Sequence, residues 1–300
     1  MLCGGPRLVP LAGAAGLYML TLLVRAVRWR ILVGAQGVQV STRRLAYLYF
    51  VGSFFNMVLP SGVGGDVVKV YELSRGGAGE LSHLEARVTS SVIADRASGL
   101  VVLFIMGVAA MPWVSGPLSA PVLLGLSGLT LGSVGAVVML LSRQWRTWAE
   151  QHVPGFLWLI HRRGVRGLYA SLDAYSWPVV GRAALVSLLF NGLIILVNVA
   201  LGAAFRLDVP LRYYLVFVPI ISFLLVLPVS INGLGVRESG YVALFGQVGV
   251  SQESALAMSL AFYAITLLAG LIGGLLYTLE NALLLGRSRS VRQADVEVPR

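Results

Sequence analysis

Long apolar segments separated by short polar stretches dominate this chain. A membrane-spanning helix needs about 20 predominantly apolar residues, with a lower limit of about 17. Segments of this kind lie at 8–24, 88–111, 118–141, 179–205 and 254–279. The pattern predicts an all-α integral membrane protein, a polytopic helical bundle.

Two further apolar segments, 45–73 and 211–250, are interrupted in the middle. Pro60 breaks the first and Pro228 breaks the second, and glycines follow each proline. Backbone that leaves the helix at membrane depth must be satisfied by surrounding protein or by a water-lined cavity. We therefore expect each segment to form two half-helices, with Pro60 and Pro228 as the structural breaks.

The composition strengthens this interpretation. Of 300 residues, 57% are hydrophobic and 12% are charged, whereas soluble proteins carry about 25% charged residues. The net charge of +10 comes from arginines spread between the apolar segments, which is typical of membrane topology and argues against a nucleic-acid partner. Cys3 is the only cysteine and the three histidines have no ligand spacing, so we expect no metal and no cofactor.

The arginines also predict the orientation of the chain, because positive residues favour the cytoplasmic side. Basic residues follow segment 8–24, flank both ends of 45–73 and follow 254–279. This places the N-terminus outside and the C-terminus in the cytoplasm. Segment 45–73 then enters and leaves on the inner side, and 211–250 on the outer side, as two opposed re-entrant hairpins.

We expect one transmembrane domain with two inverted halves. The parts are half one at about 8–141, a cytoplasmic or interfacial connector at 142–178, half two at about 179–285 and a basic cytoplasmic tail at 286–300. The tryptophans of the connector suit headgroup anchoring, and a cytoplasmic helical hairpin is the alternative. Aligning the two breaks sets Gly65 against Gly233 and Lys69 against Arg237. Inverted repeats with broken helices are common in secondary transporters, whose substrates bind where the half-helices end.

Charged residues beside the breaks are the first candidates for a headgroup site. Lys69 and Arg237 are expected to bind a lipid phosphate, unless each only anchors a half-helix at the interface. Asp66 and Glu238 could balance these cations or bind a coupling proton, and simple salt-bridging or helix capping is the alternative.

Neutral residues at the breaks complete this part of the site. Half-helix starts offer backbone N–H groups to an anion. The residues expected there are Gly64, Gly65, Gly233 and Gly235. We expect the side chains of Asn56 and Asn232 first to form hydrogen bonds with backbone groups left unpaired at the breaks, and second to contact the substrate.

Three charged residues lie outside the breaks. Asp95 and Arg96 are adjacent, so on a helix they point about 100° apart and do not pair with each other. We expect them to reach the first hairpin, with an Asp95–Lys69 pair, unless they mark a cytoplasmic helix end. Arg28 is a further headgroup candidate, although interfacial anchoring is the favoured explanation for Arg25 and Arg28.

At these residues the chain resembles the flippase-like transmembrane domain of the lysylphosphatidylglycerol synthase, or multiple peptide resistance factor, family. The resemblance spans roughly 25–280. The matching pieces are Arg25-Ala26-Val27-Arg28-Trp29, Phe54-Phe55-Asn56 through Leu59-Pro60, Gly64-Gly65-Asp66, Ser91-Val92-Ile93-Ala94-Asp95-Arg96 with Gly99-Leu100, Leu227-Pro228-Val229-Ser230, Gly233-Leu234-Gly235-Val236-Arg237-Glu238 and Gly273-Gly274.

The resemblance implies a stand-alone domain of the cell (inner) membrane that moves, or helps to move, a lipid with an anionic or aminoacylated phosphate headgroup between leaflets. There are two departures: members usually carry another helix before the Arg-x-x-Arg-Trp helix, and no aminoacyl-transferase domain follows Arg300. The synthase reaction is therefore not carried over from the resemblance. Because no His or Cys is positioned for catalysis and no nucleotide or metal motif appears, we expect no enzyme activity. The alternatives are a membrane-embedded transferase with Asp66, Asp95 or Glu238 as base, and a lipid-binding scaffold. Expected partners are membrane lipid, a second copy of the chain or a separate lipid-modifying enzyme.

Overall fold

The computed structural model describes residues 6–59, 64–74, 81–114, 120–153, 158, 165–226 and 233–294, and regular structure in these ranges is helical throughout. The first part of the chain forms α1 (Leu8–Ala35), α2 (Thr42–Val58), α3 (Gly64–Ser74), α4 (Leu81–Ala110), η1 (Met111–Trp113) and α5 (Ala120–Leu141). The connector forms α6 (Arg143–His152), α8 (Val165–Ser171) and η2 (Leu172–Ala174). The last part forms α9 (Trp177–Ala204), α10 (Leu211–Val226), α11 (Val236–Gly246) and α12 (Gln252–Ala294).

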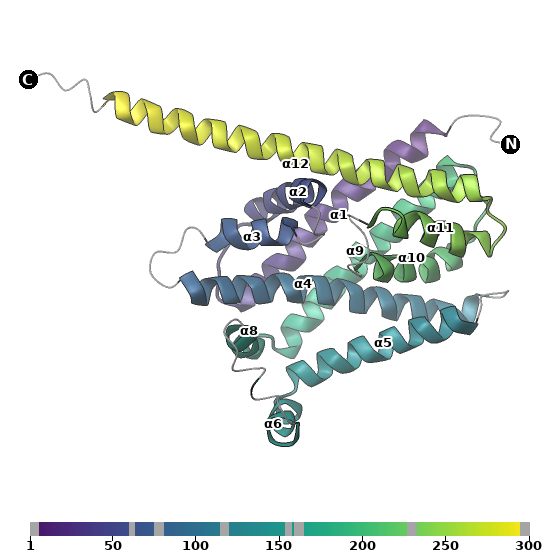
Figure 1. Cartoon of the computed structure of the whole chain (residues 1–300), viewed down its shortest axis with the longest axis horizontal. Helices are drawn as coiled ribbons and strands as arrows, with labels where there is room; N and C mark the ends of the chain where they lie inside the picture. Colours follow the sequence, from purple (N-terminus) through teal and green to yellow (C-terminus); the bar gives the residue numbers. More distant parts are fainter. Residues whose placement is uncertain are drawn as a thin grey trace, which may run out of the picture.

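Within the described ranges, five helices are long and apolar enough to cross a bilayer: α1, α4, α5, α9 and α12. They correspond to the five long apolar segments of the sequence. In Figure 1, α1, α5 and α12 run from right to left, whereas α4 and α9 run from left to right, and the two termini lie on opposite sides. The prediction of an all-α, multi-pass membrane protein is confirmed.

Helices α1 and α9 form a long antiparallel pair. Each has 28 residues, which corresponds to about 42 Å of helix, and the backbone N–H of Arg7 before α1 donates to the carbonyl of Ala204 at the end of α9. The sequence predicted that the first span would end at Val24. That end is wrong, because α1 continues through Arg25 and Arg28 to Ala35.

The first broken segment forms the pair α2 and α3, with 17 and 11 residues. Helix α2 ends where Leu59 adopts an extended backbone, as expected for a residue before proline. A Cβ atom at Gly65 would collide with the carbonyl oxygen of Gly52, so the glycine allows α3 to lie directly on α2. The Asn56 side chain accepts a hydrogen bond from Gly65 N at 2.8 Å and satisfies one free N–H of the first turn of α3.

The second broken segment has the same plan. Helices α10 and α11 contain 16 and 11 residues, and α11 begins after Gly235, whose φ of +81° is readily adopted by glycine. In Figure 1, α1 ends and α4 begins on the left, so α2 and α3 leave and return on that side, whereas α9 ends and α12 begins on the right. The N-terminal ends of α3 and α11 therefore point toward the middle of the molecule.

Two apolar clusters hold these helices together. One is built mainly from α4, α9, α10, α11 and α12, and the other mainly from α1, α2 and α4, and Tyr18 of α1 packs against both. Helix α12 packs closely on α2, since a Cβ atom at Gly273 would collide with the backbone of Phe50, and one at Gly270 would lie 3.3 Å from the Ser53 carbonyl. The glycines of 270–274 thus allow close helix packing.

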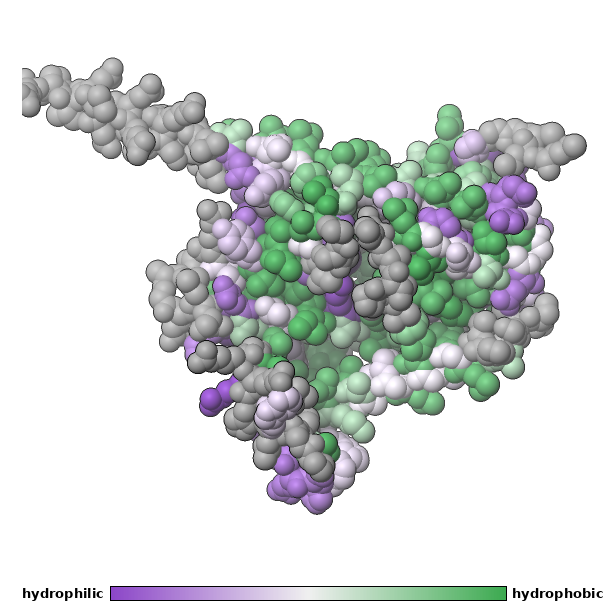
Figure 2. All heavy atoms as spheres, viewed as in Figure 1, coloured by the Kyte–Doolittle hydropathy of each residue, from purple (hydrophilic) through white to green (hydrophobic). Residues whose placement is uncertain are grey.

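On the face that Figure 2 shows, polar surface lies mainly at the edges of this apolar body. Figure 2 shows apolar residues over the middle of the visible face and polar residues at its two ends and on the lower protrusion, which α6 forms in Figure 1. Helix α12 extends to Ala294, beyond the predicted end at Leu279 and into the segment expected to be a basic tail.

Candidate functional site

A buried carboxylate, Asp95 of α4, lies at the centre of a charged cluster. Its side chain accepts a hydrogen bond from Arg28 Nε at 2.6 Å and a second one from the Tyr49 hydroxyl, and Arg25 Nη2 lies 4.0 Å away. The proposed pair between Asp95 and Lys69 is wrong, because Asp95 is bound to α1 and α2 instead.

Arg28 is enclosed within the bundle. Only 1% of the residue is exposed, its Nη1 donates to Ser187 Oγ of α9 at 3.1 Å, and its guanidinium lies 5.0 Å from the Phe190 ring. A Cβ atom at Gly99 would lie 2.7 Å from Arg28 Nη1, so the glycine provides the space for this head group. Interfacial anchoring, the explanation favoured from sequence, is wrong for Arg28.

The first half-helix start contributes a second carboxylate to the cluster. Asp66 in the first turn of α3 accepts a hydrogen bond from Lys69 Nζ at 3.1 Å and forms an ion pair with Arg96 of α4. Lys69 Nζ also lies 3.9 Å from the centre of the Tyr49 ring. Arg96 therefore reaches the first hairpin as expected, and Asp66 neutralises Lys69 by the salt bridge considered from sequence.

The cluster as a whole carries excess positive charge. Four cations surround two carboxylates: Arg25, Arg28, Lys69 and Arg96 with Asp66 and Asp95. The guanidinium of Arg25 lies between the rings of Tyr49 and Phe190, at 4.6 and 5.5 Å. Its Nε is buried without a hydrogen-bond partner among the described residues. Unsatisfied positive charge of this kind favours binding of an anion.

Arg237 of α11 is a second buried cation. It is 8% exposed, and its Nε and Nη1 are buried and have no hydrogen-bond partner in the described ranges. Its guanidinium lies over the rings of Phe262 and Tyr263, at 5.8 and 5.3 Å. Glu238 does not neutralise it; Glu238 Oε2 accepts a hydrogen bond from Gly235 N at 2.6 Å, which is the capping role considered from sequence.

Tyr18 of α1 connects the two regions. Its ring packs edge-on against Phe262 at 5.8 Å, the same ring over which Arg237 lies. Arg25 and Arg237 are both close enough to act electrostatically on the Tyr18 hydroxyl. Both incompletely satisfied guanidinium groups are thus in the neighbourhood of one tyrosine.

Some predicted site residues have a structural role or lie outside the described ranges. Asn56 and Gly65 join α2 to α3, and Gly233, with a φ of +76°, lies close to Arg237. Gly64 is the first residue of α3. Pro60, Pro228 and Asn232 lie outside the described residues.

The sequence analysis missed the polar side of α9. Ser187 accepts from Arg28, Asn191 Nδ2 donates to the Gly99 carbonyl at 2.8 Å, and Asn198 accepts from the Tyr241 hydroxyl. These three residues follow a helical spacing within an otherwise apolar span. That spacing was a signal that could have identified a buried polar face.

Comparison with known families supports the resemblance found from sequence. The family described as lysylphosphatidylglycerol synthase TM region matches residues 6–274. Comparisons with curated proteins and with solved structures gave no match. The matched region includes every helix from α1 to α11 and most of α12. The chain therefore belongs to the family of the lysylphosphatidylglycerol synthase transmembrane region.

Proposed function

We propose that this protein moves, or helps to move, a lipid with an anionic or aminoacylated phosphate headgroup between the two leaflets. Membership of the family fits a function related to membrane lipid. The observation that carries the finer proposal is the incomplete pairing of two guanidinium groups: Arg25 Nε, and Arg237 Nε and Nη1, are buried and have no hydrogen-bond partner among the described residues. A phosphate would supply acceptors to both, because its oxygens bind guanidinium groups strongly.

The arrangement of the half-helices supports this site. The N-terminal ends of α3 and α11 point toward the middle of the molecule from opposite sides (Figure 1). A helix N-terminus carries a partial positive charge and free N–H groups, both of which favour an anion. We infer two inverted halves: each has a 28-residue helix, a broken pair and a long helix. Alternating exposure of the site between the halves would carry the headgroup across while the acyl chains stay in lipid.

The two half-helix cations contribute differently to this proposal. Lys69 already has a carboxylate partner, Asp66, whereas Arg237 has none among the residues that the structure describes. Arg237 and Arg25 are therefore the primary headgroup ligands. Lys69 would bind the phosphate only if Asp66 paired with Arg96 alone, which is the other cation that it contacts.

The orientation and partners are part of the proposal. The protein would lie in the cell (inner) membrane with its N-terminus outside and its C-terminus in the cytoplasm, according to the arginine distribution. A second copy of the chain, or a separate enzyme that modifies the lipid, would be its protein partner.

Headgroup translocation in proteoliposomes tests the site. A fluorescent phosphatidylglycerol is placed in both leaflets, and the rate at which inner-leaflet label becomes accessible to an impermeant quencher is measured. Arg25→Gln and Arg237→Gln together should lower this rate at least about tenfold. The matched control is Arg182→Gln, which removes an exposed arginine from α9. Equal rates in the double variant and the control would show that the assigned site is wrong.

The same vesicles distinguish transport from catalysis. We propose that the lipid crosses without chemical change, so mass spectrometry should find its mass unaltered after translocation. A new lipid species formed in the presence of an aminoacyl or glycosyl donor would instead support the transferase alternative, with Asp66, Asp95 or Glu238 as the base.

A further inference from the structure

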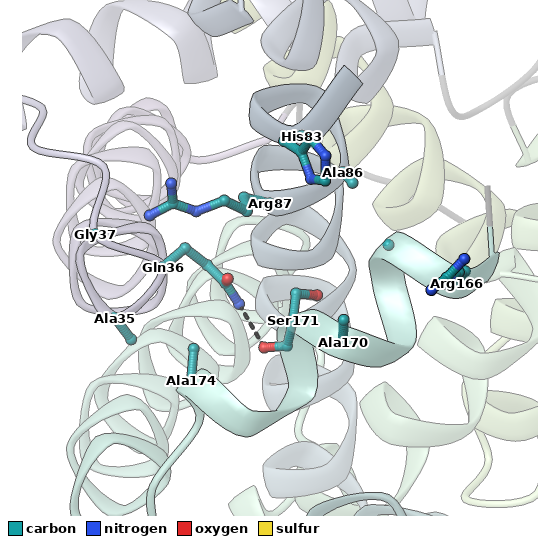
Figure 3. Close-up of a pocket in the computed structure, with 11 residues that line it drawn as sticks. Ala35, Gln36, Gly37, His83, Ala86, Arg87, Arg166, Ala170, Ser171 and Ala174 are labelled. Carbon is teal, nitrogen blue, oxygen red and sulfur yellow. Dashed lines mark hydrogen bonds between the residues drawn. The ribbon is translucent and has the colours of Figure 1, made fainter. Parts of the chain in front are cut away.

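A second polar site lies at the ends of the helices, away from the buried cluster. A pocket of about 840 Å³ is enclosed by the end of α1, the start of α4, helix α8 and η2 (Figure 3). Small residues form much of its wall: Ala35, Gly37, Ala86, Gly167, Ala170 and Ala174. At Gly167 a Cβ atom would lie 2.8 Å from Ala86, so the glycine allows α8 to approach α4 closely. The volume is within the range of small-molecule sites.

The residues of this pocket with ionisable side chains are all of basic types. His83 and Arg87 come from α4, Arg166 comes from α8, and no acidic residue is among the described residues that line the space. None of these three forms an ion pair among the described residues. The three basic side chains are exposed, and they come from different walls: Arg87 reaches toward the Gly37 turn, whereas Arg166 lies on the α8 side (Figure 3). A concave surface lined by basic residues and by no acidic residue favours an anionic ligand.

Two local features hold the pocket in shape. Gly37 has a φ of +74°, and a Cβ atom there would lie 2.5 Å from Arg87 Nη2, so the glycine leaves room for the Arg87 head group beside the turn (Figure 3). Gln36 is 4% exposed, and its Nε2 donates to the Ser171 carbonyl at 3.0 Å. This bond ties the end of α1 to the end of α8 and fixes the wall between them.

The pocket is distinct from the proposed headgroup site. Arg87 and Asp95 are eight residues apart on α4, which corresponds to about 12 Å along the helix axis. None of the residues that line the pocket belongs to the cluster around Asp95 or to the surroundings of Arg237. The two sites can therefore be tested separately.

We propose that this pocket binds a phosphate-bearing anion, with Arg87 as its charged ligand beside the Gly37 turn, Arg166 as a further positive charge on the α8 side and His83 as a hydrogen-bonding group. The phosphate belongs either to the headgroup of a lipid at this membrane face or to a soluble phosphate ester. Both present the same anionic oxygens to the guanidinium groups.

Calorimetric titration of the full-length protein in neutral detergent tests the proposal. Glycerol 3-phosphate represents the soluble source, short-chain phosphatidylglycerol the lipid source, and short-chain phosphatidylcholine a zwitterionic control. Binding of glycerol 3-phosphate identifies a soluble ester, and binding of phosphatidylglycerol without it identifies a lipid. Either result supports the site when variants of the pocket weaken the binding and Arg25→Gln with Arg237→Gln does not. Binding of neither probe would overturn the proposal.

Variants locate the binding in this pocket. Arg87→Gln and Arg166→Gln should each weaken binding about tenfold, and Arg87→Lys should restore much of the loss because it retains the charge. Ala170→Trp should block the space without changing charge. The control Arg143→Gln removes an arginine of the connector whose side chain is 80% exposed and should bind like the wild type. Equal affinities for Arg87→Gln and Arg143→Gln would place the anion elsewhere.

Discussion

At the scale of single residues, the Arg28–Asp95 pair joins four helices inside an apolar bundle. Arg28 of α1 contacts Asp95 of α4 and Ser187 of α9, and Asp95 also accepts from Tyr49 of α2. Removing one member of a buried ion pair leaves the other charge without a partner in a medium of low dielectric constant. The pair therefore constrains the relative positions of these helices.

Asp95→Asn should accordingly be strongly destabilising. We expect a loss of about 3–5 kcal/mol in the free energy of unfolding, measured as a lower midpoint in thermal or denaturant unfolding of the detergent-solubilised protein. Asp173→Asn is the matched control, because Asp173 has a half-exposed side chain and exposed ion pairs contribute at most about 1 kcal/mol. Similar stability of the two variants would contradict the structural role of Asp95.

The partners of these charges could not be predicted from sequence. Asp95, Lys69 and Arg237 were identified as candidates because they are charged residues within apolar segments. The residue bound to Asp95, however, is Arg28, which lies 67 positions earlier in the chain. Treating Arg25 and Arg28 as the end of the first span excluded that pairing in advance. Local periodicity does not contain the information, because the contact depends on how α1 and α4 pack.

At the scale of elements, helix positions were predictable and several helix ends were not. Apolar length alone located the five long helices, because a bilayer sets the required length. The sequence analysis placed the ends of α1 and α12 too early, because it treated basic residues as the end of each span. Arginine is a good helix former, so a helix can continue through arginines that bind neighbouring residues or lie outside the membrane.

The packing of α12 on α2 depends on Gly273. Gly273→Ala should push the helices apart, because the new methyl group would overlap the Phe50 backbone. We expect a loss of about 1–3 kcal/mol in unfolding measurements. Gly128→Ala on α5 is the control: no atom lies within 4 Å of the added carbon, and alanine favours the helix by about 1 kcal/mol. Equal effects at both positions would show that α12 does not rest on α2 in this way.

The attachment of α6 should depend on pH. The hydrogen bond from Arg146 holds the pKa of Asp173 below its usual value of 3.8, and the two groups lie 2.5 Å apart. Because the pKa of Asp173 is lower in the folded protein than in the unfolded chain, the contact stabilises the attachment of α6 at pH values above about 3.8. This stabilisation is lost as the pH falls through the lowered pKa.

A spin label on α6 measures this dependence. Thr147→Cys in a Cys3→Ser background places the label on an exposed position of α6. Its mobility should rise only below about pH 3.8. In Asp173→Asn the mobility should already be high at neutral pH and change little on acidification. A response centred near neutral pH in the unmodified chain would rule out Asp173 as the responsible group.

At the scale of the whole molecule, α1 and α9 connect the two groups of helices that we propose as inverted halves. The broken pairs lie on opposite sides of this central pair in Figure 1, and Tyr18 packs against both apolar clusters. A change in the position of one half relative to the other would thus alter the surroundings of Arg25 and Arg237 together. The overall plan of opposed hairpins was inferred from arginine positions, whereas the residues that line its centre required the structure.

The sidedness of the hairpins gives the sharpest test of that plan. Helix α3 has 11 residues, or about 16 Å, and cannot cross a hydrocarbon core of about 30 Å. Either α2 and α3 return to the side they came from, or together they cross once as a broken helix. Exposed flanking residues distinguish the two: Gln39 and Glu85 for the first pair, Asp208 and Ser251 for the second.

Single cysteines at these four positions, in a Cys3→Ser background, are labelled in intact cells with an impermeant maleimide. Asp208→Cys and Ser251→Cys should react, while Gln39→Cys and Glu85→Cys should react only after permeabilisation, which is also the control for accessibility. If Gln39→Cys and Glu85→Cys reacted from opposite sides, α2 and α3 would form one crossing. The number of membrane crossings before α9 would then change by one, so α10 and α11 would no longer enter from the face opposite to α2 and α3. Arg25 and Arg237 would then not belong to one translocation path.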